Sequence, residues 1–478
     1  MKKGFKIAYS VVFMAVCASP LSLIPFVGSS GGIGKNAPAE MPAFLSDGRV
    51  NSDFSTQFEA WASDRLPLRA QLLSAAGFVK GGLLHSPASN VISGKNGQLF
   101  FIDEQYDYMD TNALSPAQIR AAAVTLHLIQ EHVENAGGRF TFVPMPNKSS
   151  VYPEDMPACY QRAEENNYTR LCAQLDAAGV RYTDMLTIMT ESKAQRVYHK
   201  RDTHWNQLGA LIGFNAVMDS LGRPHKRYDG VHYTLEKTWE GDLDKLLYPA
   251  AAPKDYQYRF EIGYEPFVFT YPAGVTDMQA QLASFMSDRE ENDSDFTARC
   301  LGDAQNEKLY MVRDSFGRAL LPFVIDNYKT ATFVRTDRPD ITRAEGGDMV
   351  YEIVERNLQN IIATAPYQFA PERDVPRASP GGAVQDVHWS DEGYAIRICG
   401  VLPEDADTGD GRVCIRLTQG NAERCFEAFP ILEREQFPDA KGTNGFSLYI
   451  SPDAGLSRDY GMCVITGDRS YEAGALRV

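Results

Sequence analysis

The chain has 478 residues, of which 44% are hydrophobic, and its formal net charge at pH 7 is −15. This length predicts two or three domains with packed cores, and nothing in the composition indicates wholesale disorder. The negative charge argues against a surface that binds nucleic acid or anionic lipid, although it does not exclude a local basic groove.

Residues 1–28 have the layout of an export signal. Lys2, Lys3 and Lys6 precede an uncharged stretch whose apolar part runs from Ile7 to Gly28, about the ~20 residues that span a bilayer. The segment is therefore expected to be either a signal peptide or an uncleaved N-terminal membrane anchor. Both alternatives place the rest of the chain outside the cytoplasm, in a periplasmic or other extracytoplasmic compartment.

Export also permits disulfides, so the cysteines after Cys17 are interpreted as pairs. A turn centred on Gln419-Gly420 would bring two of them together on adjacent strands. The connectivity stays open, because a sequence does not determine it. The expected pairs are Cys159 with Cys172, Cys414 with Cys425, and Cys399 with Cys463, which leaves Cys300 alone.

The first elements have clear sequence signals. Residues 54–76 are expected to be helical with a break at Pro67. Asn96-Gly97 predicts a hairpin between two short strands. Ser115, Pro116 and Gln118 then supply an N-cap, a first-turn proline and a capping-box partner for a helix that runs to about residue 135.

Strands and helices then alternate, which predicts an α/β fold with a mainly parallel sheet covered on both faces. The large domain is expected to span residues 29–370. Its predicted strands are 139–143, 180–184, 309–312, 331–334 and 349–354, and its predicted helices are 163–178, 207–221 and 318–328.

The composition and the pattern of predicted elements change after residue 365. A Pro/Gly-rich linker at 371–383 precedes short strand-like runs separated by turn signals, which predict a C-terminal all-β sandwich at 384–478. Its aromatic residues could form a platform for stacking on sugar, but aromatic residues in strands more often pack in a core. These residues are Trp389, Tyr394, Phe426, Phe429, Phe446 and Tyr449.

Two segments carry the residue types needed for acyl transfer. In RDTHWNQLGA, Asp202 and His204 are two positions apart, so on an extended backbone they point to the same side. An adjacent carboxylate can hold an imidazole in one tautomer and stabilise its charged form. In KLYMVRDSFGRALLPF, Ser315 follows a strand, where open α/β sheets place their ligand sites. By local pattern alone, however, Ser315 is the N-cap of a helix.

Taken together, the motifs resemble the SGNH-hydrolase-like domain of alginate O-acetyltransferases of the AlgJ/AlgX type. The resemblance covers roughly residues 45–365 and rests on motifs that follow one another in the family's order. It implies a three-layer α/β/α domain in which Ser315 is the nucleophile, His204 the base and Asp202 its partner. The motifs are RDTHWNQLGA, VRDSFGRALLPF, WEGDLDKLL, PNKSSVYPEDMP and VYEIVERNL.

Other residues near these motifs have more than one interpretation. Arg313 stands where related motifs usually have glycine, so it could reshape the turn before the serine or contact an acidic sugar. The backbone N–H of Ser315 is the expected oxyanion donor, and Asn147 or Lys148 could supply another. Arg356 could bind a substrate carboxylate, although pairing with Glu352 is favoured, and Asp314 is expected to cap the helix.

These observations predict an enzyme that transfers acetyl groups to hydroxyls of an exported polysaccharide through an acetyl-serine. No cofactor or metal site is expected, since neither a metal-ligand grouping of histidines and cysteines nor a phosphate-binding loop is present. The resemblance implies a membrane O-acyltransferase partner that supplies acetyl groups, together with other polymer synthesis or export proteins; the protein itself is expected to be a monomer. An acetylesterase with the same triad and a non-catalytic polysaccharide-binding scaffold are the alternatives. The identity of the polysaccharide stays open.

Overall fold

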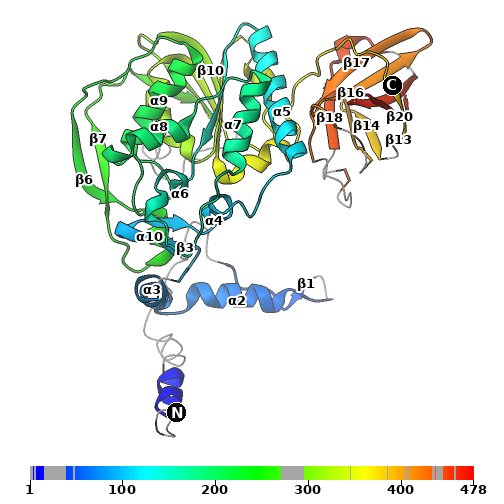
Figure 1. Cartoon of the computed structure of the whole chain (residues 1–478). Coiled ribbons are helices and arrows are strands. Elements are labelled where there is room, and N and C mark those ends of the chain that lie inside the picture. Colours follow the sequence, from blue (N-terminus) through cyan, green and yellow to red (C-terminus); the bar gives the residue numbers. More distant parts are fainter. Residues whose placement is uncertain are drawn as a thin grey trace.

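The computed structural model describes residues 4, 7–15, 39–46, 49–84, 86–270, 295–344, 346–384, 386–403, 406, 408–432, 436–437, 445–456 and 459–477. It comprises a large α/β unit, a C-terminal β unit packed at its side, and N-terminal helices that extend away from both (Figure 1).

A six-stranded mixed sheet lies at the centre of the large unit. Four neighbouring strands run parallel, and two antiparallel strands complete one edge. Every residue of β5 and β12 is buried, as expected for parallel strands covered on both faces. In spatial order the strands are β5 (Phe140–Met145), β12 (Asp348–Val354), β10 (Asn306–Val312), β11 (Tyr328–Val334), β9 (Phe296–Cys300) and β8 (Phe267–Thr270).

Two hydrophobic clusters cover the two faces of this sheet. One joins the sheet to α9 (Gln207–Leu221), η6 (Phe316–Leu320) and α12 (Leu321–Ile325). The other joins it to α5 (Pro116–Asn135), α7 (Asn167–Ala178) and η8 (Glu355–Ile362). The sheet therefore lies between two helical layers.

Helix starts follow the signals in the sequence. The capping box of Ser115 and Gln118 is formed at the start of α5. Asn206 caps α9 by accepting hydrogen bonds from Leu208 N and Gly209 N, at 3.1 and 3.0 Å. Because Asn206 directly follows Trp205, this cap also determines where the DTHW segment ends and α9 begins.

Shorter elements surround this framework. The predicted Asn96-Gly97 hairpin is formed, and both of its turn residues have positive φ angles, of 53° and 76°. The elements are β3 (Val91–Ser93), η2 (Lys95–Gly97), β4 (Leu99–Phe101), α4 (Glu104–Tyr108), α6 (Lys148–Val151), η3 (Pro153–Asp155), α8 (Met185–Ser192), η4 (Lys193–Gln195), β6 (Tyr233–Trp239), α10 (Asp242–Leu247), β7 (Asp255–Phe260) and η7 (Ile341–Ala344).

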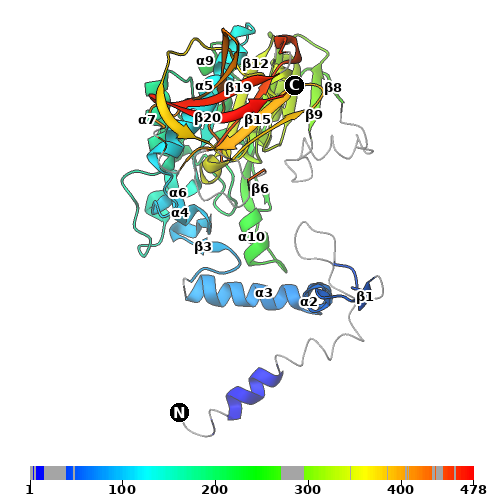
Figure 2. The same ribbon diagram turned by 90° about the vertical axis from the view of Figure 1, so that its right-hand side faces the viewer.

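The N-terminal region extends below the large unit. Both views show α2 (Phe54–Arg65) and α3 (Arg69–Gly77) crossing at a wide angle, with a helix at 7–15 beyond them (Figures 1 and 2). The strands β1 (Leu45–Ser46) and β2 (Arg49–Val50) precede α2, and η1 (Phe78–Leu83) continues α3. Among the described helices, none combines the length and apolar character needed to cross a bilayer. Most of the predicted signal or anchor, beyond 7–15, lies outside the described residues.

The C-terminal unit contains two β-sheets that enclose one hydrophobic core. A further cluster of this unit, which includes Phe429 and Tyr449, packs against the layer of α5. The sheets consist of β13 (Ser379–Ala383), β20 (Arg469–Leu476), β19 (Tyr460–Thr466), β16 (Val413–Gln419) and β17 (Ala422–Ala428), and of β14 (Val387–Asp391), β15 (Ile396–Val401) and β18 (Gly445–Ile450); the short turn η9 (Pro452–Ala454) follows β18.

Charged residues connect the two units. Arg373 donates to Glu131 on α5 at 2.7 Å and to Glu427 on β17 at 2.6 Å. Of the aromatic residues considered as a sugar platform, Tyr394 is exposed and Trp389 partly buried, whereas the others pack in the core.

Three predicted segments differ in the structure. Residues 180–184 do not form a strand: Tyr182 makes one isolated bridge to Phe142, because α8 begins at Met185. The helix expected at 318–328 divides into η6 and α12 and ends at Ile325, since Tyr328 already starts β11. The end of the predicted linker is strand β13, which pairs with β20.

The structure does not contain the expected disulfides. Cys159 is exposed, whereas Cys172 is partly buried on α7, and the two are not joined. The hairpin turn places Glu427, not Cys425, opposite Cys414, so these two thiols are diagonal neighbours rather than a bonded pair. Cys463 is not joined to Cys399, which lies on a strand of the other sheet.

The packing of α5 gives a direct test of the layered core. Leu126 is fully buried against the sheet, so Leu126→Ala should lower the free energy of unfolding by about 2–5 kcal/mol through lost burial and the cavity left behind. The neighbouring His127 is exposed, and His127→Ala should change it by less than about 0.5 kcal/mol. Urea unfolding of both variants measures the difference; equal losses would contradict this packing.

Candidate active site

The structure brings Ser315, His204 and Asp202 together at the carboxyl end of the central sheet. Ser315 follows β10 and starts η6, whereas the other two residues lie in the loop between η4 and α9. His204 Nε2 is 2.9 Å from Ser315 Oγ, and His204 Nδ1 is 2.7 Å from Asp202 Oδ1. Because an ionised carboxylate only accepts hydrogen bonds, Nδ1 carries the proton and Nε2 can accept the hydroxyl proton of the serine.

Asp202 is buried and its carboxylate is surrounded by donors. Oδ1 also accepts from the backbone N–H of His204 at 2.9 Å. Oδ2 accepts from Trp239 Nε1 and from the backbone N–H of Asp242, both at 3.0 Å. The imidazole therefore faces a carboxylate that is held in place on both oxygens.

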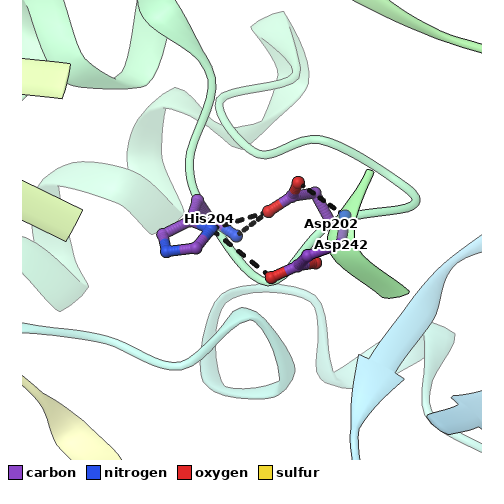
Figure 3. A group of neighbouring side chains, drawn as sticks. All are labelled: Asp202, His204 and Asp242. Atoms are coloured by element: carbon purple, nitrogen blue, oxygen red, sulfur yellow. Dashed lines mark hydrogen bonds and ion pairs between the residues drawn. The ribbon is translucent and has the colours of Figure 1, made fainter. Parts of the chain in front are cut away.

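A second carboxylate lies beside the same imidazole (Figure 3). Asp242 Oδ2 is 3.6 Å from His204 Nδ1. Asp242 also accepts from Thr203 N at 2.9 Å and from Thr203 Oγ1 at 2.6 Å. The Thr203 hydroxyl is in turn 3.0 Å from His204 Nδ1, so it lies between the two groups.

These contacts shift the pKa values of the site. Burial opposes ionisation of Asp202, but its hydrogen bond with His204 and the histidine's charge outweigh burial and hold the pKa of Asp202 well below its ordinary value. Burial likewise disfavours a charged His204, yet the hydrogen bond and charge of Asp202, helped by Asp242, raise the pKa of His204. The site thus stabilises an imidazolium, the form that a general base produces.

Trp205 links the histidine segment to the serine turn. Its indole Nε1 donates to Phe316 O at 3.0 Å, and the rings of His204 and Phe316 are 4.8 Å apart. The tryptophan of the DTHW motif is buried and therefore holds the loop of the base against the residue that follows the nucleophile.

Ser315 occupies the N-cap position of η6, but its side chain makes no capping hydrogen bond. Asp314 precedes the N-cap residue, and its Oδ1 accepts from Phe316 N at 2.8 Å, so Asp314 holds the turn at the start of η6. Glu352 on β12 accepts from Asp314 N and Gly317 N, both at 3.0 Å. Two carboxyl groups thus organise the turn, and the serine hydroxyl is directed to the histidine instead.

Lys148 supports the loop that contains the base. Its ammonium group is fully buried and donates to the carbonyl oxygens of Asp202 at 2.6 Å and of His199 and Lys200 at 3.2 Å. Burial lowers the pKa of Lys148 to about 8, although the charges of nearby carboxylates oppose this. With its donors directed at three carbonyls, Lys148 is placed to position the loop rather than to contact an oxyanion.

Asn147 is also buried and hydrogen-bonded within the protein. Its side-chain amide donates to Asp107 at 3.0 Å, and its backbone N–H donates to Glu355 at 2.7 Å. Arg356 donates to Asn147 Oδ1 at 3.4 Å, and its guanidinium lies 5.6 Å from the centre of the Phe316 ring. The expected pairing of Arg356 with Glu352 is wrong, because Glu352 faces the serine turn.

Arg313 is buried, and its guanidinium donates to Asp314 O at 3.2 Å. Its backbone N–H donates to Val334 O on β11 at 3.0 Å, which extends the strand pairing up to the serine turn. The side chain therefore forms part of the support beneath the turn.

Sequence reasoning missed Asp242, Trp239 and Glu352 as parts of the site. Asp242 and Trp239 belong to the WEGDLDKLL motif, so that motif was the available signal, but nothing in it indicates contact with residues 202–204. Glu352 lies within an apolar strand pattern, where a single acidic residue was the signal that could have found it.

Asp202, His204 and Asp242 are close enough to be considered as metal ligands. However, both oxygens of Asp202 accept hydrogen bonds from protein donors, and the 2.7 Å between His204 Nδ1 and Asp202 Oδ1 is a hydrogen-bond distance. The donor set fits a histidine oriented by carboxylates better than a metal centre.

Part of the chain is similar to known proteins. Residues 91–320, which include all three residues of the triad, match the family model described as the SGNH hydrolase-like domain of the acetyltransferase AlgX. This part of the chain is therefore similar to an AlgX-type SGNH hydrolase-like domain. The probable alginate O-acetylase AlgJ of Pseudomonas putida is 22% identical to the chain over 230 residues, which are 47% of this chain and 55% of that protein. The chain thus spans about half the length of this curated relative.

The solved structures that resemble the chain are less similar in sequence. The O-acetyltransferase domain of Pseudomonas putida AlgJ is 16% identical, with a TM-score of 0.36, and the match covers 56% of this chain and 92% of that domain. A DHHW family protein from Eubacterium siraeum is 15% identical, with a TM-score of 0.43, and the match covers 57% and 95%. The similarity to AlgX-type domains rests on the sequence matches.

Glu352 and Asp314 lie behind Ser315, and this pair of carboxyl groups should make the stability of the fold depend on pH. Burial, followed by the charge of and hydrogen bond to Asp314, raises the pKa of Glu352 well above its ordinary value. A raised folded-state pKa means that its stabilising effect is present below about pH 4.3, the ordinary glutamate pKa, and is lost as the pH rises through the folded value. Glu352→Gln keeps a neutral acceptor, so its melting temperature should rise relative to wild type as the pH increases.

Glu352→Ala is the matched comparison, because it removes the acceptor of Asp314 N and Gly317 N and should destabilise the turn at every pH. Thermal melts between about pH 5 and pH 9 compare the three proteins around the ordinary pKa and above it. A constant difference between Glu352→Gln and wild type across this range would contradict a neutral Glu352.

Proposed function

We propose that this protein is an O-acetyltransferase that carries an acetyl group on Ser315 and passes it to a hydroxyl of an exported polysaccharide. The observation that carries this proposal is the continuous hydrogen-bonded chain from Asp202 through His204 to Ser315. Asp202 is buried, whereas His204 and Ser315 are partly exposed, as a nucleophile and base that meet a substrate need to be.

In the first step, Ser315 Oγ attacks the carbonyl carbon of an acetyl donor while its proton passes to His204 Nε2. The resulting imidazolium is stabilised by Asp202. Collapse of the tetrahedral intermediate breaks the bond to the leaving group, which takes the proton from Nε2. Acetyl-Ser315 and a neutral His204 remain.

In the second step, a sugar hydroxyl gives its proton to His204 Nε2 and attacks the acetyl carbon. Ser315 Oγ then leaves and recovers the proton from Nε2, so the enzyme returns to its starting state. The backbone N–H of Ser315, in the turn held by Glu352 and Asp314, is the proposed donor to the oxyanion. Arg356, which contacts the Phe316 ring beside the serine, is proposed to face the substrate.

The wider assignments are part of the same proposal. We infer an extracytoplasmic, periplasmic location from the N-terminal export pattern, and a membrane O-acyltransferase as the source of acetyl groups. The relative's name refers to alginate, and alginate-like polymers are the first acceptors to test. The two C-terminal sheets, which enclose one core, are proposed to form a β-sandwich that serves as a carbohydrate-binding module.

Variants of the triad test the reaction. Purified protein is incubated with an acetyl ester and oligosaccharide acceptors, and acetylated sugar is measured by mass spectrometry. Ser315→Ala and His204→Gln should each reduce transfer by ~10³-fold or more, since each removes a group that acts in both steps. Acetyl-Ser315 should be detectable in the wild-type protein in the absence of an acceptor.

His232→Gln is a matched control, because His232 is largely exposed and its contact is with Glu261, away from the triad. It should leave transfer unchanged. Free acetate as the only product would identify an acetylesterase instead. Transfer that is unaffected by Ser315→Ala would remove the catalytic proposal and favour a polysaccharide-binding scaffold.

A further inference from the structure

We propose that Asp242 is a second carboxylate partner of the catalytic base and positions His204 together with Asp202. The inference rests on the proposed function, because it assigns a role in the same triad. It concerns how the base is held and charged, and Asp242 acts through His204 and Thr203 rather than by contact with the substrate.

The backbone brings Asp242 to the base through an unusually close approach. Gly241 precedes α10, and a Cβ at this glycine would lie 2.0 Å from Arg201 O and 2.6 Å from Arg201 C. Only a residue without a side chain allows the start of α10 to pack this tightly against the loop of the base. The N–H of Asp242 consequently reaches Asp202 Oδ2 at 3.0 Å.

The side chain of Asp242 also holds Thr203, the residue between Asp202 and His204, in place. It accepts from both the backbone N–H and the hydroxyl of Thr203, at 2.9 and 2.6 Å. Because the Thr203 hydroxyl donates to Asp242, its oxygen can accept from His204 Nδ1, which lies 3.0 Å away. The proton on Nδ1 therefore faces Asp202 directly and Asp242 through Thr203.

The charges around His204 make this second carboxylate relevant to the base. Asp202 and Asp242 both favour the imidazolium, and Arg356 opposes it. Lys148 donates to the backbone carbonyl of Asp202, and His199 also interacts electrostatically with the Asp202 carboxylate. Burial, then the charge of Asp202, raises the pKa of Asp242 to about 6, so Asp242 is largely ionised at neutral pH. Two negative charges, rather than one, then stabilise the protonated base.

The experiment measures reaction of Ser315 with phenylmethanesulfonyl fluoride, which needs no acetyl donor or sugar. Ser315 Oγ forms a bond to sulfur, fluoride leaves, and the serine proton passes to His204. The reaction therefore requires a neutral His204. The second-order rate constant falls at low pH, and this fall, the acid limb of the pH profile, reports the pKa of that histidine. Mass spectrometry of the modified peptide confirms that the adduct is on Ser315.

Asp242→Asn should move the acid limb to lower pH, because removing a negative charge makes the imidazolium less stable. Its limiting rate at high pH should fall by roughly tenfold, because a less basic imidazole takes the serine proton less readily. Thr203→Val, which keeps the shape but removes the hydroxyl, should lower the rate as well. Combining Asp242→Asn with Asp202→Asn should abolish the residual reaction of Asp202→Asn alone.

Asp219→Asn is the matched control. It removes one negative charge from an exposed position on α9, so the acid limb and the rate should stay at their wild-type values. An acid limb that Asp242→Asn does not move, in a variant with a wild-type melting temperature, would overturn the inference while leaving the serine nucleophile intact. A wild-type protein without a Ser315 adduct would overturn the proposed function, and this inference with it.

Discussion

A buried carboxylate is stable only when hydrogen-bond donors surround it. The donors that Asp202 needs hold the parts of this site together. Its two oxygens receive four donors, from His204 N and Nδ1, Trp239 Nε1 and Asp242 N. An isolated charge at this depth would cost several kcal/mol. Although burial raises the pKa of Asp202, the hydrogen bonds and charge of His204 hold that pKa below its ordinary value. The donors come from two separate segments, so the charge of Asp202 fixes the loop of the base against the start of α10.

A second buried carboxyl group, Glu352, supports the serine side of the triad, but its pKa is raised rather than lowered. Glu352 lies behind the serine turn, and burial beside Asp314 raises the pKa of Glu352 and so favours its protonated form. A neutral carboxyl still accepts backbone hydrogen bonds, so it can hold the turn without adding a second charge next to Asp314. Carboxyl groups therefore serve two purposes here: Asp202 is ionised and supports the base, whereas Glu352 is neutral and supports the nucleophile. Both lie on or beside rigid elements, which suits a site that must keep its geometry through two acyl-transfer steps.

Several parts of the fold could be predicted because their signals are local. The capping box at Ser115, the Asn96-Gly97 turn and the boundaries of α9 each depend on residues within one or two turns of the backbone. Residues 180–184 show the limit of such signals. They have the composition of a strand, but the strand-like segment makes a single bridge, because whether a strand forms depends on the neighbour it finds.

The disulfides show the same limit at the level of register. A two-residue turn at Gly420-Asn421 instead of one centred on Gln419-Gly420 is enough to move Cys425 from the position opposite Cys414 to a diagonal one.

In the active site, the types and order of the triad residues could be predicted from the sequence together with its resemblance to a family. The same sequence left Ser315 as a helix cap on local grounds, and the contact with His204 Nε2 decided against that.

By itself, the sequence determined the features that depend on residue type and short spacing: alternating helices and strands, the Asp-x-His pair, the serine at a strand end and the caps of individual helices. Only the tertiary structure decided which groups face one another across long separations. Asp242 is 38 positions from His204, and Glu352 is 35 from Gly317. No local pattern encodes those contacts, because they arise where α10, the loop of the base and the strands of the sheet pack together. The groups brought together there, with burial, set the pKa of each carboxyl group.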